Sequence, residues 1–313
     1  MDSLTSAPSA AARARAERLE NLPFETVAEG HNGARRSGIA SIRAVLSHRE
    51  LLGLLVNREL KARYKDSSLG LVWSLVRPLA QFLVYFFAIG QILGLARSIP
   101  SFAIFVFVGL SMWSLFSEIL TSGTTSITSN AGLIKKIYVP REIYPLATVG
   151  GALFNFGVQL VILLVATIVS GSAPWHWSLL YAPLSLALVL VYGFAFALAL
   201  SAINVYLRDV QHLVEVALIV LFWASPIVYS FSFVESKIGG TVLEWLYLSN
   251  PVTLAVLGAQ KAFWIDGSHQ EGVVNFPPNL WLAMLVALAV GFVLLWFAHR
   301  IFNRLQANFA QEL

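Results

Sequence analysis

The sequence lacks cysteine and has little charge. None of its 313 residues is Cys, which excludes disulfides, thiolate metal sites and cysteine nucleophiles. Charged residues make up 12% of the chain, about half of the roughly 25% found in soluble domains. Hydrophobic residues make up 57%, and the mean hydropathy is +0.72. Because so little charge cannot cover a large surface in water, the sequence predicts an integral membrane protein.

The patterns of several catalytic chemistries are also missing. There is no G-x-x-x-x-G-K-[ST] segment, so the chain has no loop of this kind to hold ATP phosphates. Ser126 and Ser129 lack the G-x-S-x-G context of a hydrolase nucleophile. The histidines lie far apart and show no metal-ligand spacing (His31, His48, His176, His212, His269 and His299). We therefore expect no catalytic residue, no metal and no cofactor in this chain.

Long apolar runs set the predicted fold. A membrane-spanning helix needs about 20 predominantly apolar residues, because each residue rises 1.5 Å across a core of roughly 30 Å. Six runs qualify, at residues 69–95, 102–120, 143–169, 177–204, 210–231 and 280–301. The sequence therefore predicts an all-α integral membrane domain over residues 46–305 with six transmembrane helices. Residues 1–45 contain no signal-peptide core and are expected to form a disordered cytoplasmic tail, with residues 306–313 as a cytoplasmic C-terminus.

The basic residues are unevenly distributed between the loops. With both termini inside, the cytoplasmic side holds eleven Arg or Lys between Arg13 and Lys65, and six later ones (Lys135, Lys136, Arg141, Arg208, Arg300 and Arg304). The outer side holds only Arg97, Lys237 and Lys261. Cytoplasmic loops carry the excess of Lys and Arg, so both termini are predicted to be cytoplasmic. The net charge of +4 reflects this topology and does not indicate nucleic-acid binding.

Residues 241–264, between the fifth and sixth runs, are apolar but interrupted by Asn250-Pro251. Proline removes a backbone donor and disfavours helix at the residue before it. The two halves are each too short to cross a bilayer, so we expect a re-entrant pair of half-helices at the outer face. The alternative is a seventh, kinked span, which would place Arg300 and Arg304 outside, against the charge rule.

Two segments outside the runs are candidates for contacts at the inner face. Residues 46–66 are predicted to form an amphipathic interface helix, with a capping-box spacing at Ser47 and Glu50 and an interrupted apolar face. Residues 121–142 are predicted to form a cytoplasmic loop. The latter is too apolar around Leu133 for an idle connector, and exposed apolar residues rimmed by charge usually mark a contact with a partner.

Several stretches together resemble the polysaccharide-export permeases of the ABC-2 type. Arg58-Glu59-Leu60 and Arg63-Tyr64-Lys65-Asp66-Ser67-Ser68-Leu69-Gly70, followed by Trp73 and Pro78-Leu79, resemble the opening of these proteins. Asn130, Gly132-Leu133-Ile134-Lys135-Lys136, Val139-Pro140-Arg141-Glu142 and Pro145-Leu146 resemble their second-helix loop, and Asn250-Pro251 matches a weaker third feature. The resemblance covers about residues 46–305, and the order and spacing of these motifs make it specific.

The resemblance implies a transport subunit with no enzymatic activity. Members of this family pair as homodimers and bind a separate ATPase subunit, giving a 2:2 complex in which ATP and Mg belong to the partner. Their cargo is an undecaprenyl-linked polysaccharide of the O-antigen, teichoic acid, capsule or cell-wall galactan kind, carried outward across the bacterial inner membrane. By the same resemblance, Asn250 and Pro251 would form the outer gate. The residues implied in coupling to the ATPase are Arg58, Arg63, Tyr64, Leu133, Lys135, Lys136, Arg141 and Glu142.

Aromatic and ionisable residues of the spans leave alternatives open. Aromatic faces can stack on sugar rings, so Tyr85, Phe222 and Trp223 are candidates for the substrate channel, although most such residues serve as interfacial belts or packing. Arg77, Glu118 and Glu215 lie near span ends, where a structural role is favoured over proton relay. An exporter of a drug or simple lipid is one alternative function. A membrane-embedded glycosyltransferase is another, although it would need clustered carboxylates that the sequence does not show.

Overall fold

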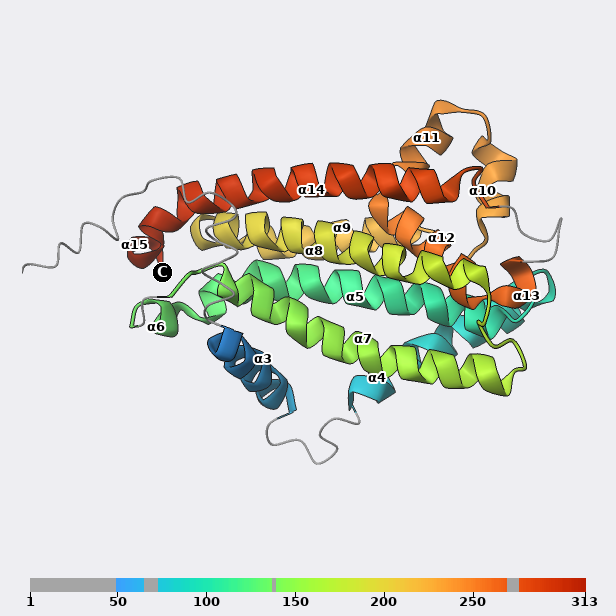
Figure 1. Cartoon of the computed structure of the whole chain (residues 1–313), viewed down its shortest axis with the longest axis horizontal. Helices are drawn as coiled ribbons and strands as arrows, with labels where there is room; N and C mark the ends of the chain where they lie inside the picture. The colour runs from blue at the N-terminus through green and yellow to red at the C-terminus, as the bar shows by residue number, and fades with distance from the viewer. Residues whose placement is uncertain (1–48, 65–72, 137–138, 269–275) are drawn as a thin grey trace, which may run out of the picture. The chain divides into compact units, whose positions relative to one another are not determined.

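The apolar runs of the sequence form long helices that lie side by side (Figure 1). The computed structural model describes residues 49–64, 73–136, 139–268 and 276–313, all of them within one compact unit of residues 37–313. Among these residues the regular structure is entirely helical. The α-helices are α3 (Arg49–Tyr64), α4 (Trp73–Tyr85), α5 (Phe102–Ser129), α6 (Ala131–Ile134), α7 (Ile143–Val169), α8 (Tyr181–Tyr206), α9 (Val210–Trp223), α10 (Phe231–Ile238), α11 (Val242–Leu248), α12 (Pro251–Phe263), α13 (Ile265–Ser268), α14 (Leu280–Leu305) and α15 (Phe309–Glu312).

Four of the six predicted spans are long and apolar enough to cross a membrane. They are Phe102–Ser129, Ile143–Val169, Trp177–Tyr206 and Leu280–Asn308. The other two predicted spans correspond to shorter apolar helices, Pro78–Ile92 and Val210–Trp223. The all-helical membrane fold is confirmed in this coarser form, and the number of six spans stays a prediction.

The first predicted span, residues 69–95, is described from Trp73 onward. After α4 the helix widens into a π-helical segment, Phe86–Ile92, and Gly94 ends it with a φ of 79°. Glycine takes this left-handed conformation without a steric cost, which is why it commonly stops a helix.

The predicted fifth span, residues 210–231, is helical only as far as Trp223. Pro226 lies three residues later, and a proline cannot donate the backbone hydrogen bond that would continue the helix. Polar side chains of α12 satisfy the carbonyls at this break. The Gln260 amide donates to the Pro226 carbonyl at 2.8 Å, and the Thr253 hydroxyl donates to the Ala224 carbonyl at 3.2 Å. The end of α9 is therefore built into the protein and is not a frayed terminus.

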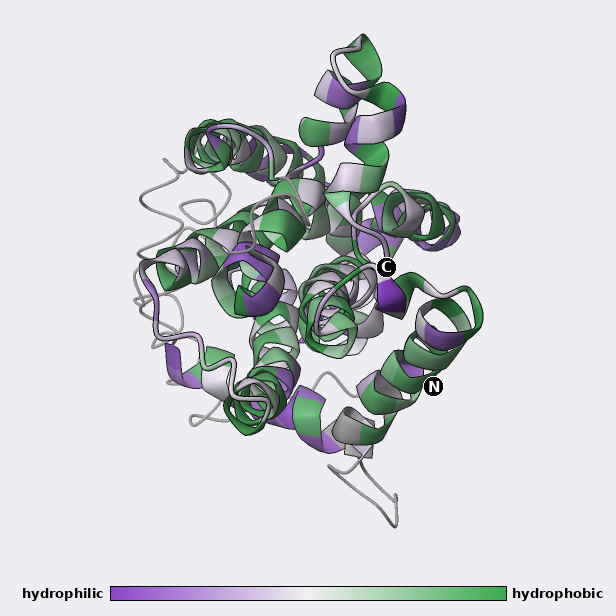
Figure 2. Ribbon diagram, turned by 90° about the vertical axis from the view of Figure 1, so that its right-hand side faces the viewer, coloured by the Kyte–Doolittle hydropathy of each residue, from purple (hydrophilic) through white to green (hydrophobic). Residues whose placement is uncertain are grey.

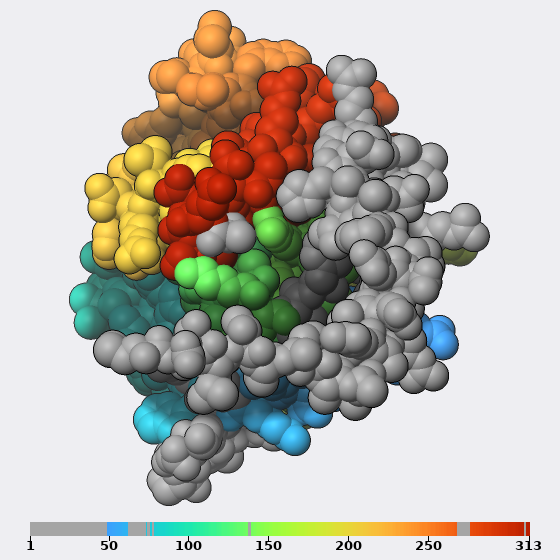
Figure 3. All heavy atoms as spheres, turned by 90° about the vertical axis from the view of Figure 1, so that its left-hand side faces the viewer, coloured from blue at the N-terminus to red at the C-terminus, as the bar shows by residue number. Residues whose placement is uncertain are grey.

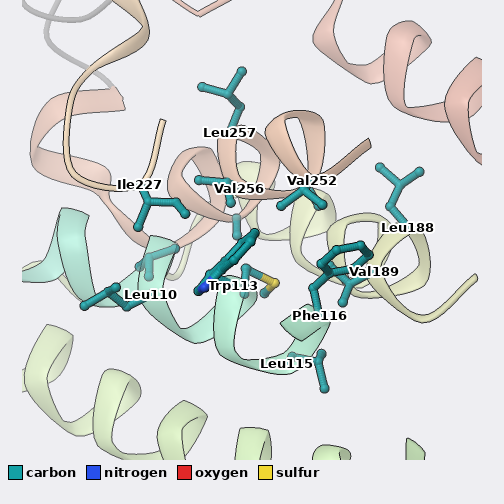
Figure 4. Close-up of a cluster of buried hydrophobic side chains, with 14 of the residues drawn as sticks. Leu110, Trp113, Leu115, Phe116, Leu188, Val189, Ile227, Val252, Val256 and Leu257 are labelled. Carbon is teal, nitrogen blue, oxygen red and sulfur yellow. The ribbon is translucent and has the colours of Figure 1, made fainter. Parts of the chain in front are cut away.

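Helix α5 forms the centre of the bundle. In its most apolar window 78% of the residues are buried, and it packs most extensively against α8 and α7. The large side chains Trp113 and Phe116 project from α5 toward Val189 of α8 and Val252 of α12, as Figure 4 shows. Helix α12 is almost wholly buried beside them. The core is thus made by α5, α8 and α12, with α7, α9 and α14 around it.

The outer faces of the bundle are apolar as well. Figure 2 shows hydrophobic residues on the outward as well as the inward sides of the long helices. Val161 and Val165 of α7 and Val290 and Val293 of α14 are all more than half exposed. Exposed apolar side chains cost free energy in water but not in lipid, so these faces fit a membrane setting.

The predicted cytoplasmic loop, residues 121–142, is helical over much of its length, which corrects the predicted end of the second span. Helix α5 runs on to Ser129, and α6 follows after a single residue. The hydroxyl of Thr121 donates to the Ser117 carbonyl at 2.8 Å, and that of Thr124 donates to the Leu120 carbonyl at 2.7 Å. These bonds satisfy the polar side chains within the helix, so the chain stays helical where its hydropathy falls.

Helix α3, within the predicted interface helix of residues 46–66, packs against α7. Leu55 is buried. A methyl group added at Gly150 of α7 would stand only 2.7 Å from the Val56 side chain. Glycine at this position therefore permits the close approach of the two helices. Part of the apolar face predicted for α3 is accordingly covered by protein.

Candidate functional site

A cavity of about 900 Å³ lies within the part of the chain that the structure describes. Its volume lies within the roughly 300–1,000 Å³ typical of ligand sites. It is bounded by α3, α4, α5 and α7, and hydroxyl, amide and carboxylate groups predominate in its lining. The lining residues are Leu55, Arg58, Glu59, Trp73, Pro78, Gln81, Ser114, Ser117, Glu118, Thr121, Ser122, Thr125, Ser126, Ser129, Asn130, Tyr144, Ala147, Thr148, Asn155 and Gln159.

One wall of this cavity is a row of hydroxyl groups along α5. Ser117, Thr121 and Thr125 follow one another at a spacing of four residues, so they share a face of the helix. Their hydroxyls donate to carbonyls of the same helix, Ser117 to Ser114 at 3.2 Å and Thr125 to Thr121 at 3.3 Å. From Ser114 to Asn130 the row extends over about 24 Å at the helical rise.

Helix α7, which packs beside α5, supplies amide groups to the lining. The Asn155 side chain donates to the Glu118 carboxylate at 2.7 Å, where α7 packs against α5. Asn155 and Gln159 are 8% and 4% exposed, so these polar groups are well inside the protein. A hydrogen bond to a charged acceptor is stronger than one between neutral groups, and it fixes the carboxylate relative to α7.

Two buried hydroxyl groups in the lining have no protein partner among the described residues. The Ser126 hydroxyl and the Tyr144 hydroxyl lack a hydrogen bond, while the two residues are 3% and 2% exposed. Buried polar groups are nearly always hydrogen-bonded, because an unmet group costs free energy. Both oxygens are fully enclosed, so they are unmet groups within the cavity wall and are not open to the cavity itself.

The mouth of the cavity joins α3 to the end of α5. The Arg58 guanidinium donates to the Asn130 side-chain oxygen, and the Asn130 amide donates to the Ser126 carbonyl at 2.8 Å. Glu59 turns toward α7, and its carboxyl carbon lies 3.5 Å from the place of a methyl group at Gly151. Arg58, singled out from the sequence for coupling, is therefore also part of the cavity lining.

A smaller cavity of about 270 Å³ continues the polar lining toward α9. It shares Thr121, Ser122 and Thr125 with the large cavity and reaches Glu215. His212 lies 3.4 Å from the Glu215 carboxylate. Two of the three ionisable residues noted in the predicted spans, Glu118 and Glu215, thus line hollows. The side chain of the third, Arg77, lies outside the described residues.

The three predicted channel aromatics do come together in the structure. The Tyr85 and Phe222 rings are stacked with their centroids 5.5 Å apart, and Phe222 meets Trp223 edge-on at 5.5 Å. Phe222 is 6% exposed and Trp223 is 55% exposed. The cluster therefore contains one packing residue and one open aromatic face, and the role of these residues in a channel stays a prediction.

The predicted gate residues lie at the bend between α11 and α12. The helices meet at 74°, which fits a broken span or a re-entrant loop. The Asn250 side chain accepts from the Val252 backbone amide at 3.0 Å, capping α12, while Pro251 occupies the first helical position. Asn250 also donates to the Ser225 hydroxyl at 3.2 Å. The expected pair of half-helices is present, although α12 is buried and α11 is not.

The predicted coupling residues differ in their exposure. Lys135 and Lys136 are exposed beyond α6, whereas Leu133 packs partly against the buried cluster at that end of the bundle. The side chains of Arg63 and Tyr64 lie outside the described residues. Contact of these residues with an ATPase stays a prediction.

Arg141 and Glu142 face the C-terminal segment. The Arg141 guanidinium donates to the Gln306 carbonyl and lies 5.6 Å from the Phe309 ring centre. Glu142 is 8% exposed and lies 3.8 Å from His299. Figure 3 shows the red C-terminal segment against the green segment around α6 at this end of the molecule. The buried Phe309 thus packs residues 306–313 against the bundle. The sequence predicts these residues only as a cytoplasmic C-terminus, without such a contact.

The sequence reasoning missed the cavity, although part of its signal was present. The polar residues of α5 recur at helical spacing from Ser114 to Ser129, but the predicted span ended at residue 120. The sequence favours a structural role for Glu118, and the context of Ser126 and Ser129 speaks only against a hydrolase nucleophile. A stripe of hydroxyls on one helical face is the pattern that could have found this wall.

The sequence matches the family model of the ABC-2 type transporters over residues 50–264. The chain belongs to this family. The matched region includes α3 to α12 and hence the whole cavity lining. Membership agrees with the motifs from Arg58 to Leu146, which resemble such permeases. Members of this family are transport subunits.

Sequence similarity to known proteins covers most of the chain. An O-antigen export system permease protein RfbA from Myxococcus xanthus is 32% identical over 275 residues, which cover 88% of this chain and 100% of that protein. A protein of the same name from Klebsiella pneumoniae is 27% identical over 267 residues, covering 84% of this chain and 95% of that protein.

Proposed function

We propose that this chain is the membrane permease of an ATP-driven exporter of polysaccharide. The observation that carries the proposal is the 900 Å³ cavity with its row of hydroxyl, amide and carboxylate groups inside an otherwise apolar membrane domain. Polar side chains within a membrane domain are costly and mark a substrate path. The names of the similar proteins, which are O-antigen export permeases, support a polysaccharide as cargo.

The energy source in this proposal is a separate ATPase subunit that carries ATP and Mg. Two copies of the permease pair and bind two ATPase subunits. The absence of a G-x-x-x-x-G-K-[ST] segment supports a motor on another chain. The ATPase contact would use the exposed Lys135 and Lys136, which follow α6, because exposed charges suit an electrostatic contact with a partner.

The membrane arrangement proposed is that of a bacterial inner membrane protein with both termini in the cytoplasm. The excess of Lys and Arg at the α6 and α15 end supports this orientation. The shorter helices α4 and α9 would complete six spans, and α11 with α12 would form the outer gate at Asn250 and Pro251. Cargo would move outward as an undecaprenyl-linked chain of the O-antigen or cell-wall galactan type.

A simple lipid or apolar drug is a poorer fit to this cavity. Such a cargo would cover the polar lining, including the Glu118 carboxylate, without replacing its hydration. A glycan offers hydroxyls that both donate and accept, so it can take the place of water at this polar lining.

The test is co-purification with candidate ABC ATPase subunits from the same organism, followed by ATP hydrolysis in nanodiscs with and without lipid-linked polysaccharide. We expect a stable 2:2 complex whose turnover changes when the lipid-linked glycan is added. Failure to associate with an ATPase would overturn the proposal.

Charge reversal provides the matched variants for the coupling contact. Lys135→Glu with Lys136→Glu should reduce glycan-dependent ATP turnover while membrane insertion is unchanged. Lys237→Glu, an exposed lysine on α10 at the proposed outer side, is the control and should keep full turnover. Equal turnover in the two variants would remove Lys135 and Lys136 from the coupling contact.

A further inference from the structure

We propose that the docked C-terminal segment positions the ATPase contact at Lys135 and Lys136. The inference rests on the proposed function, from which it takes the contact itself. It adds residues that hold the segment 139–142 against the ends of α8 and α14 and so fix where the two lysines lie. We call these residues the C-terminal clamp: Arg141, Glu142, Tyr206, His299, Phe302 and Phe309.

Phe309 is the apolar anchor of the C-terminal clamp. Its side chain is fully buried, with the Phe302 ring edge-on at 5.7 Å and the Tyr206 ring at 6.4 Å between centroids. The Arg141 guanidinium lies 5.6 Å from the centre of the Phe309 ring, within the range of a cation–π contact. One ring therefore contacts side chains from α8, from α14 and from the segment that precedes α7. Buried aromatic rings contribute strongly to packing, so this contact joins the three parts firmly.

Two polar contacts tie the end of α14 at the same place. The Tyr206 hydroxyl donates to the Leu305 carbonyl at 2.7 Å, and the Arg141 guanidinium donates to the Gln306 carbonyl. The last carbonyls of a helix lack partners within it, so donors from other parts of the chain satisfy them. A cation at the C-terminal end of a helix is also favoured by the helix dipole. Arg141 is thus held in place by the helix end that it caps.

The clamp divides the predicted coupling residues into two kinds. Glu142 is 8% exposed and lies 3.8 Å from His299, so it is too enclosed to offer its charge to the surface of a partner. Arg141 uses its guanidinium on Gln306 and Phe309. The resemblance implies both residues in coupling, and their contacts point to a role that acts through position. The exposed Lys135 and Lys136 are the residues left to meet the ATPase directly.

The two lysines lie between two anchors. On one side α6 follows α5 after a single residue, and on the other side Arg141 comes five residues after Lys136. Five residues extend over at most about 18 Å, so the clamp limits where the lysines can be. Without the clamp, one of the two anchors is lost. A loosened segment must be ordered when the partner binds, and this ordering weakens binding.

The first experiment measures the clamp without an ATPase, by backbone amide exchange of residues 139–144 in the full chain in nanodiscs. Phe309→Ala should raise the exchange rate about tenfold or more, because it removes the buried anchor. Tyr206→Phe keeps the ring and removes only the bond to the Leu305 carbonyl, so it should raise the rate about threefold. Phe105→Ala is the control. Phe105 is 1% exposed and packs against Trp264 near the other end of α5, so its loss should leave exchange at residues 139–144 unchanged.

The second experiment titrates the ATPase against the permease in nanodiscs that contain lipid-linked polysaccharide. In Phe309→Ala the ATPase concentration at half-saturation should rise about fivefold, because the lysines must be ordered on binding. Turnover at saturation should stay within about twofold of the wild type. Phe309→Leu keeps an apolar side chain in the site and should restore most of the affinity. A merely structural loss of folded permease would instead lower turnover at saturation and leave the half-saturation unchanged.

The outcomes separate this inference from the proposed function. Unchanged exchange in Phe309→Ala, or a half-saturation equal to that of the wild type, would overturn the inference alone. A loss confined to turnover at saturation would overturn it as well. Should Phe309→Ala not fold, Tyr206→Phe decides the same question, with an expected rise in half-saturation of about twofold. A wild-type chain that binds no ATPase refutes the proposed function, and the positioning role falls with it, while raised exchange in the variants would still establish the clamp.

Discussion

Gly123 controls how closely α5 can approach α8. A methyl group at this position would stand closer than 3.0 Å to the Cβ atom of Ala197 and 3.3 Å from its Cα atom. Neither atom can rotate away, because both are fixed to the helix backbone. Substitution of Gly123 by Ala must therefore push the helices about 1 Å apart to restore ordinary contact of 3.4–4 Å.

The cost of this displacement follows from two opposing terms. Overpacking a close helix interface destabilises by about 1–3 kcal/mol. Alanine in place of glycine in a helix interior returns roughly 0.5–1 kcal/mol. We therefore expect Gly123→Ala to lower the free energy of unfolding by about 1–2 kcal/mol. The assay is thermal or SDS-induced unfolding in detergent, followed by tryptophan fluorescence.

Gly157→Ala isolates the helix-propensity term. Gly157 lies in α7 and has no atom within 4 Å of the place where a Cβ would be, so this variant should be neutral or more stable. Adding Ala197→Gly to Gly123→Ala removes the opposing methyl and should restore stability, with a coupling of about 1–2 kcal/mol between the two changes. If Gly123→Ala unfolds as Gly157→Ala does, or if the second change gives no rescue, the close approach is refuted.

Three further substitutions test particular contacts. Asn250→Ala should lower the free energy of unfolding by about 1 kcal/mol, because α12 loses the cap on the Val252 amide; unchanged thermal unfolding would contradict this role. Arg141→Ala should speed proteolysis of the C-terminal segment, because the bond to the Gln306 carbonyl is lost; equal cleavage rates would show that this bond does not hold the segment. Tyr192→Phe should destabilise by about 1 kcal/mol, because its hydroxyl donates to a carbonyl of α14 at 2.8 Å, and an unfolding midpoint equal to the wild type would exclude that contribution.

The apolar runs predicted helix positions well where hydropathy and hydrogen bonding change at the same residue. The run at residues 143–169 matches α7 (Ile143–Val169) at both ends, since Glu142 precedes it and Ser170 follows it. The predictions failed where the two properties separate. Hydropathy falls at Thr121 while the helix continues to Ser129, and it stays high to residue 231 while Pro226 ends α9.

The cavity cannot be predicted from the sequence, because it is enclosed by helices that are far apart along the chain and meet only in the folded protein. Asn155 and Glu118 are 37 residues apart and meet only when α7 packs beside α5. Arg58 meets Asn130 across 72 residues. A pattern along one helix can show that a polar face exists, but it cannot show which other helices leave space in front of that face.

The central position of α5 nevertheless follows from its composition once the chain is placed in a membrane. Of the four long spans, α5 is the least apolar and the most buried, at 78% of its window, while α14 is the most apolar and the least buried, at 17%. A helix with a hydroxyl face cannot turn that face to lipid without losing hydrogen bonds, so it must turn it toward protein or water. The helix most costly to expose thus becomes the centre of the bundle, and its polar side is where a hydrated path can form. By this argument the row from Ser117 to Thr125 favours the central position of α5 in the bundle.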